Sequence, residues 1–101
     1  MIQQIDFYLT YLERTRGIPD GKIKLIPFIE TAEGIVRAFE VCTASNRNIA
    51  ICFGAEDYTA DLGIRRTPDG AELLQARATL ANAAIAANLI PIDTPEPDFS
   101  N

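Results

Sequence analysis

The sequence contains no histidine in its 101 residues, and it is poor in positive charge. Without histidine, the chain has no Ser-His-Asp or Cys-His catalytic arrangement, no imidazole metal ligand and no usual general base for neutral pH. Its 9 Lys and Arg face 14 Asp and Glu, for a net charge of −5. Because no basic stripe is present to neutralise phosphates, we expect no nucleic acid partner.

The sequence also lacks a long apolar run and a cysteine motif. Its longest apolar stretch, residues 81–92, is broken by polar residues and by Pro91, and it falls short of the ~20 residues that a membrane-spanning helix needs. No secretory signal begins at Met1. Cys42 and Cys52 show neither CxxC spacing nor metal-site partners, so we expect two buried, reduced thiols. These features predict a cytoplasmic protein that binds no membrane.

What the chain does contain is a regular alternation of helical and strand patterns. Hydrophobic residues make up 48% of it, an ordinary globular composition, and we expect residues 1–101 to form a single domain. Continuously apolar strands that alternate with helices are typical of a parallel sheet with crossover helices, an α/β fold. The predicted order is helix 3–16, strand 22–29, helix 31–43, strand 49–53, polar loop 54–66, helix from about 68–70 to 88, and strand 89–93, followed by an irregular tail 94–101.

Local patterns refine the two longer helices. Ile5, Leu9 and Leu12 share one face of the first helix. The last helix is rich in alanine almost all round, which predicts close packing on more than one side. Two N-terminal caps are possible for this helix. One is Thr67 followed by Pro68, and the other is a capping box formed by Asp69 and Glu72.

Acidic residues follow each of the three predicted strands, at Glu30, Asp57 and Asp93. Ligands of parallel α/β folds bind beyond the carboxyl ends of the strands, and neighbouring strands lie ~4.8 Å apart. Glu30 and Asp57 can therefore converge on one cation, and two carboxylates with water and substrate oxygens are a usual Mg²⁺ site. The alternative is that Glu30 caps the helix that begins at Thr31, and that Asp57 belongs to a solvated loop.

The segment between the second strand and Asp57 offers a second binding element. Gly54 lets a ligand approach the backbone, and the successive amides of Gly54, Ala55 and Glu56 can bind a carboxylate; a plain turn glycine is the other reading. Adjacent Arg65 and Arg66 could clamp an acidic ligand, or at least one of them forms only an ion pair. For Arg77, in the middle of a helix, packing or a surface pair is the interpretation we adopt.

Four segments carry a resemblance to a known family. Residues 26–34 (IPFIETAEG), 53–67 (FGAEDYTADLGIRRT), 70–77 (GAELLQAR) and 91–94 (PIDT) resemble motifs of the citrate lyase beta-subunit family. That family belongs to the wider HpcH/HpaI aldolase group, with malyl-CoA lyases as close relatives. The resemblance extends from Ile23 almost to the C-terminus, in the same order and with the same spacing.

The resemblance implies a (β/α)₈ barrel that holds a divalent metal, normally Mg²⁺, through the positions of Glu30 and Asp57. It also implies that the backbone around Gly54, Ala55 and Glu56 binds the carboxylate of an oxo-acid. Members of the family cleave or form a carbon–carbon bond next to a thioester, for example in citryl-CoA or malyl-CoA. The acyl-CoA or oxo-acid would then be the substrate, with the metal as Lewis acid.

The chain departs from the family in extent. A barrel takes ~250 residues, so this chain resembles only the part that covers strands five to seven, and it has no counterpart of the family's upstream arginine. One hypothesis is therefore a lyase fragment that keeps the metal carboxylates. Another is a non-catalytic protein whose open strand edges pair with a second copy, as a homo-oligomer, or complete another chain's barrel. A third is a thioesterase or simple aldolase for an oxo-acid without CoA.

Overall fold

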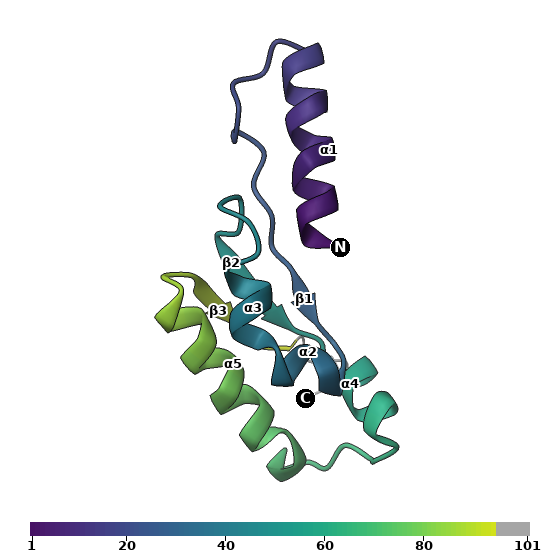
Figure 1. The fold of residues 1–101 in the computed structure, drawn as a ribbon. Coiled ribbons are helices and arrows are strands. Elements are labelled where there is room, and N and C mark those ends of the chain that lie inside the picture. Colours follow the sequence, from purple (N-terminus) through teal and green to yellow (C-terminus); the bar gives the residue numbers. More distant parts are fainter. Residues whose placement is uncertain (95–101) are drawn as a thin grey trace.

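A computed structural model describes residues 1–94 as three parallel strands connected by helices (Figure 1). The irregular tail is predicted for residues 94–101, and all of it except Thr94 lies outside the described residues. The elements, in chain order, are α1 (Ile2–Thr15), β1 (Phe28–Ile29), α2 (Ala32–Val36), α3 (Ala38–Cys42), β2 (Ala50–Phe53), α4 (Ala55–Leu62), the short 3₁₀ helix η1 (Ala71–Leu73), α5 (Leu74–Ala86) and β3 (Ile90–Ile92).

The strands lie in the order β1-β2-β3, and every pairing is parallel, which confirms the predicted topology. The first strand is much shorter than expected. Its ladder with β2 begins at Phe28, and one isolated parallel bridge joins Leu25 to Asn48 further upstream. Pro27 stands between the two pairings and has no N–H to donate, so the ladder is interrupted there.

Within the described residues, the helices that build the core cover one face of the sheet (Figure 1). On that face Ile29, Ile51 and Phe53 pack against the helices, whose contribution to the core is Ile35, Ala38, Cys42, Ala55, Leu73, Ala76, Leu80, Ala83 and Ala84. Strand residues of the opposite parity point to the other face. There Phe28 is 57% exposed and Ile90 is 64% exposed, so this apolar face lies open. In a (β/α)₈ barrel the helices cover the outer face of the sheet, and the inner face of the sheet is apolar. The two faces of this sheet have the same arrangement.

Three helix predictions need correction. The predicted loop 54–66 contains helix α4, which buries Ala55 and Thr59 one turn apart and ends at Gly63 in the left-handed region (φ 72°). The predicted helix 31–43 is broken at Arg37 into α2 and α3. The alanine-rich helix α5 is buried along one stripe and not on several sides, since Leu74 is 70% exposed. Short helices that depend on tertiary contacts carry weak local signals, which explains the first two errors.

Neither predicted cap forms at the start of α5, although the residues proposed for the caps bond to one another and to the Ala71 amide. The Glu72 carboxylate accepts hydrogen bonds from the amide and the hydroxyl of Thr67, while Asp69 Oδ1 accepts from the Ala71 amide. Neither side chain caps η1 itself, whose first position is preceded by Gly70 in the left-handed region.

Helix α1 attaches to the rest of the chain through polar side chains of one face. Arg47, in the turn before β2, is 4% exposed and forms a two-pronged ion pair with the fully buried Glu13 of α1. The same guanidinium donates to Asp6 Oδ1, Thr10 Oγ1 and the carbonyl of Ile23. In Figure 1, α1 accordingly stands beside the loop that leads to β1, away from the other helices.

Candidate functional site

Glu30 and Asp57 meet at the carboxyl ends of β1 and β2. Glu30 directly follows β1, and Asp57 is the third residue of α4, in its first turn. The pKa of Glu30 is raised, first by burial and then by a hydrogen bond and charge repulsion from Asp57. The two carboxyl groups therefore lie close enough to repel one another, and a cation between them would relieve that repulsion.

Gly54 makes room for the Glu30 side chain. A Cβ atom at position 54 would lie 2.5 Å from Glu30 Cγ and 2.8 Å from Glu30 Oε1. The backbone of Gly54 itself is in a conformation that other residues adopt (φ −102°). The close approach of Glu30, and not the turn, therefore favours glycine here. This differs from the plain turn reading, and the approach of a ligand to this backbone stays a prediction.

Not every amide of the predicted carboxylate-binding segment is available. The Gly54 amide donates to the Ile29 carbonyl, and the Ala55 amide donates to Thr94 Oγ1 at 3.1 Å. The next two amides, of Glu56 and Asp57, lie in the first turn of α4, where a helix has no internal acceptor for them. The N-terminal end of a helix favours negative charge, so these two amides are the ones that suit an anion.

The charged side chains around the segment form ion pairs. Glu56 Oε1 accepts from Arg66 Nη1 at 2.6 Å, so its side chain points to an arginine while its amide remains at the helix start. Asp93, the third acidic residue at a strand end, accepts from Arg77 Nε at 3.0 Å. The structural pairs expected for one of the two adjacent arginines and for Arg77 are thus confirmed. Arg65 is exposed.

Helix α2 is capped by Thr31 and not by Glu30. The Thr31 hydroxyl accepts from the Gly34 amide at 3.0 Å. The alternative role of Glu30 as a helix cap is therefore wrong, because the residue beside it already fills that position. Asp57, in turn, lies on a helix and not in a loop.

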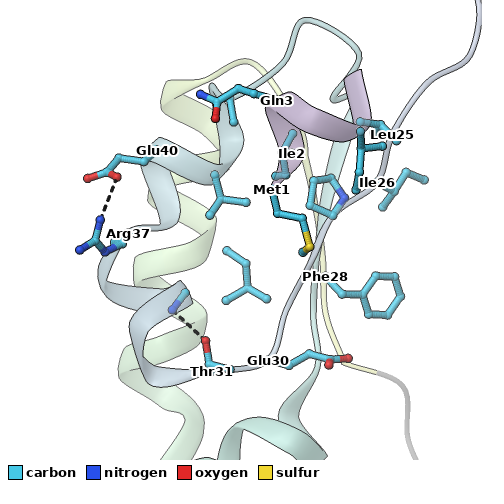
Figure 2. A pocket seen from close by; sticks show the side chains of 16 residues that line it. Met1, Ile2, Gln3, Leu25, Ile26, Phe28, Glu30, Thr31, Arg37 and Glu40 are labelled. Atoms are coloured by element: carbon cyan, nitrogen blue, oxygen red, sulfur yellow. Dashed lines mark hydrogen bonds and ion pairs between the residues drawn. The ribbon is translucent and has the colours of Figure 1, made fainter. Parts of the chain in front are cut away.

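A cavity of about 730 Å³ lies beside β1, between the N-terminus of α1, the segment 25–31 and helices α2 and α3. Figure 2 shows the side chains that line it, among them Met1 and Ile2 of the N-terminal segment and Phe28 and Glu30 of the segment around β1. Glu30 contributes to the rim, but Asp57 does not line this space. The cavity is thus mostly apolar, and of the two carboxyl groups only that of Glu30 borders it.

The donor set at the strand ends fits a hard divalent cation. Carboxylate oxygens are preferred ligands of Mg²⁺, which keeps several waters and often binds through one or two carboxylates with substrate oxygens. Within residues 1–94, no three Asp, Glu or Cys side chains come close enough to enclose a metal by themselves. The pair of Glu30 and Asp57 therefore matches an open site, in which water or substrate completes the coordination.

Two further residues beside this pair were not anticipated from the sequence. Asp61 of α4 accepts from the Ala32 amide at 2.9 Å, and Thr94 ties the end of β3 to the start of α4. The four-residue spacing of Asp57 and Asp61 would have placed both on one helix face, had α4 been recognised as a helix.

Both cysteines lie in the interior of the described residues. Cys42 and Cys52 are free and buried, as expected, and burial raises the pKa of both thiols. Over residues 1–94, every helix is too short or too polar to cross a bilayer.

Comparison with known proteins gives consistent matches. The family described as HpcH/HpaI aldolase/citrate lyase matches residues 1–100. Citrate lyase subunit beta of Leuconostoc mesenteroides subsp. cremoris is 42% identical over 94 residues, which are 93% of this chain and 31% of the relative. The L-malyl-CoA/beta-methylmalyl-CoA lyase of Haloarcula marismortui is 37% identical over 90 residues, covering 82% of this chain and 25% of that protein.

A solved structure agrees with these relatives. The citrate lyase beta subunit of M. tuberculosis, complexed with oxaloacetate and magnesium, superposes with a TM-score of 0.65 at 34% identity, over 74% of this chain and 35% of that one. The fold is therefore the expected partial (β/α)₈ barrel segment. The chain spans about a third of the length of the citrate lyase beta subunits it matches.

Proposed function

The chain belongs to the HpcH/HpaI aldolase/citrate lyase family, and from this premise we propose that it carries the metal-binding part of a Mg²⁺-dependent carbon–carbon lyase. The substrate would be a 3-hydroxyacyl-CoA such as citryl-CoA or malyl-CoA, which is cleaved to an oxo-acid and acetyl-CoA. The observation that carries the proposal is the meeting of Glu30 and Asp57 at the ends of β1 and β2. Residues 1–101 would form one partial domain.

In this proposal the two carboxylates bind the metal and leave its other positions open. When bound, a divalent cation supplies Lewis-acid stabilisation of the negative charge that develops on the oxo-acid. Gly54 keeps the space that the Glu30 side chain occupies. The amides of Glu56 and Asp57, at the positive end of α4, would receive the substrate carboxylate and orient it.

Metal binding by the 101-residue chain tests this proposal. We expect Glu30→Ala and Asp57→Ala each to abolish Mg²⁺ binding in calorimetry, because each removes one of the two proposed protein ligands. Asp93→Asn is the matched control, since Asp93 also follows a strand but pairs with Arg77. Unchanged Mg²⁺ affinity in both alanine variants would contradict the proposal.

Substrate class needs a separate measurement. A turnover screen with citryl-CoA, malyl-CoA and free hydroxy acids distinguishes a CoA-dependent lyase from a simple aldolase or a thioesterase. Cleavage of free hydroxy acids alone would favour the aldolase, and release of CoA without an oxo-acid would favour the thioesterase.

A second function is favoured by the open apolar face of the sheet. Phe28, Ile90 and Ile92 are exposed there, and β1 and β3 are edge strands. Such a face and such edges favour association, either with another copy of this chain or with a chain that supplies further strands of a barrel. Light scattering at rising concentration tests this, and a monomer at high concentration would count against it.

A further inference from the structure

Asp61 links the two segments that carry Glu30 and Asp57. Its Oδ2 atom accepts a hydrogen bond of 2.9 Å from the Ala32 amide, across 29 residues of sequence. Ala32 is the first residue of α2 and lies two residues after Glu30. Asp61 lies one helical turn after Asp57 on α4. One hydrogen bond thus joins the chain just beyond one carboxylate to the helix just beyond the other.

We propose that Asp61 is a positioning residue, which holds the β1–α2 connection against α4 so that Glu30 and Asp57 stay within reach of one metal ion. This inference rests on the proposed metal site. Positions 57 and 61 lie on the same face of α4. The hydrogen bond from Ala32 to Asp61 therefore holds the face that carries Asp57 against the β1–α2 connection.

Asp61 acts through the backbone and is not a third ligand. Its carboxylate is engaged with the Ala32 amide, and residues 1–94 contain no cluster of three acidic or thiol side chains. The hydrogen bond also places a negative charge at the N-terminus of α2, where the helix dipole favours it. The Gly34 amide, in the same turn, donates to the Thr31 hydroxyl. Asp61 therefore accepts from a helix-start amide, that of Ala32, which Thr31 does not bind.

Two variants remove this hydrogen bond from opposite sides. Asp61→Ala removes the acceptor. Ala32→Pro removes the N–H donor, and proline suits this position, because Ala32 is the first helical residue and Thr31 before it is extended (φ −128°, ψ 158°). Asp61→Asn keeps an acceptor oxygen but loses the charge. Glu33→Gln is the matched charge control, since Glu33 lies in the first turn of α2 and pairs with exposed Arg37.

The readout is the affinity for Mn²⁺, measured by electron paramagnetic resonance on the 101-residue chain, with melting temperatures recorded for each variant. We expect Asp61→Ala and Ala32→Pro each to weaken binding about 10- to 100-fold, the range for residues that orient metal ligands. Asp61→Asn and Glu33→Gln should stay within about 3-fold of the parent. Exchange of the Ala32 amide should accelerate in Asp61→Ala and stay slow in Asp61→Asn.

The outcomes separate this inference from the proposed function. Parent-like affinity in Ala32→Pro or in Asp61→Ala, while Glu30→Ala and Asp57→Ala lose binding, would overturn the role of Asp61 alone. Equal losses in Asp61→Asn and Asp61→Ala would also overturn it, because charge and not the hydrogen bond would then matter. Equal Mn²⁺ affinity in the parent, Glu30→Ala and Asp57→Ala would overturn the metal site and this inference with it.

Discussion

Arg47 and Glu13 are 34 residues apart in sequence and form a two-pronged ion pair, with Nη1–Oε2 at 2.7 Å and Nη2–Oε1 at 2.6 Å. Glu13 also accepts from the amides of Gly21 and Ile23, so its carboxylate is fully engaged. The pair lies at the end of the sheet opposite to Glu30 and Asp57, near the start of β2. In barrel folds that end carries stability, whereas the other end carries chemistry.

Replacing Arg47 with Met should detach α1. The substitution leaves Glu13 buried without its countercharge, and loss of one partner of a buried pair is among the most destabilising single changes. We expect the melting temperature, followed by circular dichroism, to fall by roughly 10 °C or more. Arg14→Met is the matched control, because Arg14 pairs with exposed Asp20 and its loss should cost little. Equal melting temperatures for the two variants would contradict the assigned role of Arg47.

Stability should fall with acid over a defined range of pH. Hydrogen bonding to Arg47 holds the pKa of Glu13 at about 2, against 4.5 in the unfolded chain, and Ser45 and Arg47 lower the pKa of Asp6. Because the folded-state pKa is depressed, this stabilisation is complete above pH 4.5 and is lost as the pH falls towards 2. Urea midpoints between about pH 7 and pH 2 measure it. Glu13→Gln should show a flatter curve, and a parent curve just as flat would refute the assignment.

Gly54→Ala should impair metal binding more than folding. A methyl group at this position overlaps Glu30 Cγ and Oε1, so the Glu30 side chain must move, while the backbone of Gly54 accepts alanine. We expect Mn²⁺ affinity to fall about 10-fold or more with a nearly unchanged melting temperature. A parent-like affinity in the single variant would show that Glu30 need not lie over Gly54.

Both cysteines should be unreactive in the folded chain. Burial raises the pKa of the Cys42 and Cys52 thiols, and burial also blocks approach of a reagent. We expect alkylation by iodoacetamide at about pH 8 to be roughly 100-fold slower than in denaturant, where local structure no longer protects the thiols. Mass spectrometry of the labelled chain measures both sites at once. Rapid labelling of Cys52 without denaturant would mean that the open face of the sheet admits solvent to β2.

The sequence by itself determined the alternation of helices and parallel strands, and it placed Glu30 and Asp57 at neighbouring strand ends. Apolar runs bounded by turn residues specify buried strands locally, and parallel pairing then brings equivalent strand ends to one edge. The family motifs are likewise local in sequence, so they suffice to predict the (β/α)₈ segment.

Only the tertiary structure decided which polar groups meet. The local pattern of residues 54–66 predicts a loop in place of α4, because the few buried residues of this helix, Ala55 and Thr59, become buried only when it packs at the end of the sheet. The Arg47–Glu13 pair and the Asp61–Ala32 hydrogen bond join residues that are 34 and 29 positions apart, and no local periodicity marks such partners. A hydrogen bond depends on distance and orientation to within fractions of an ångström, and only the packed chain sets these.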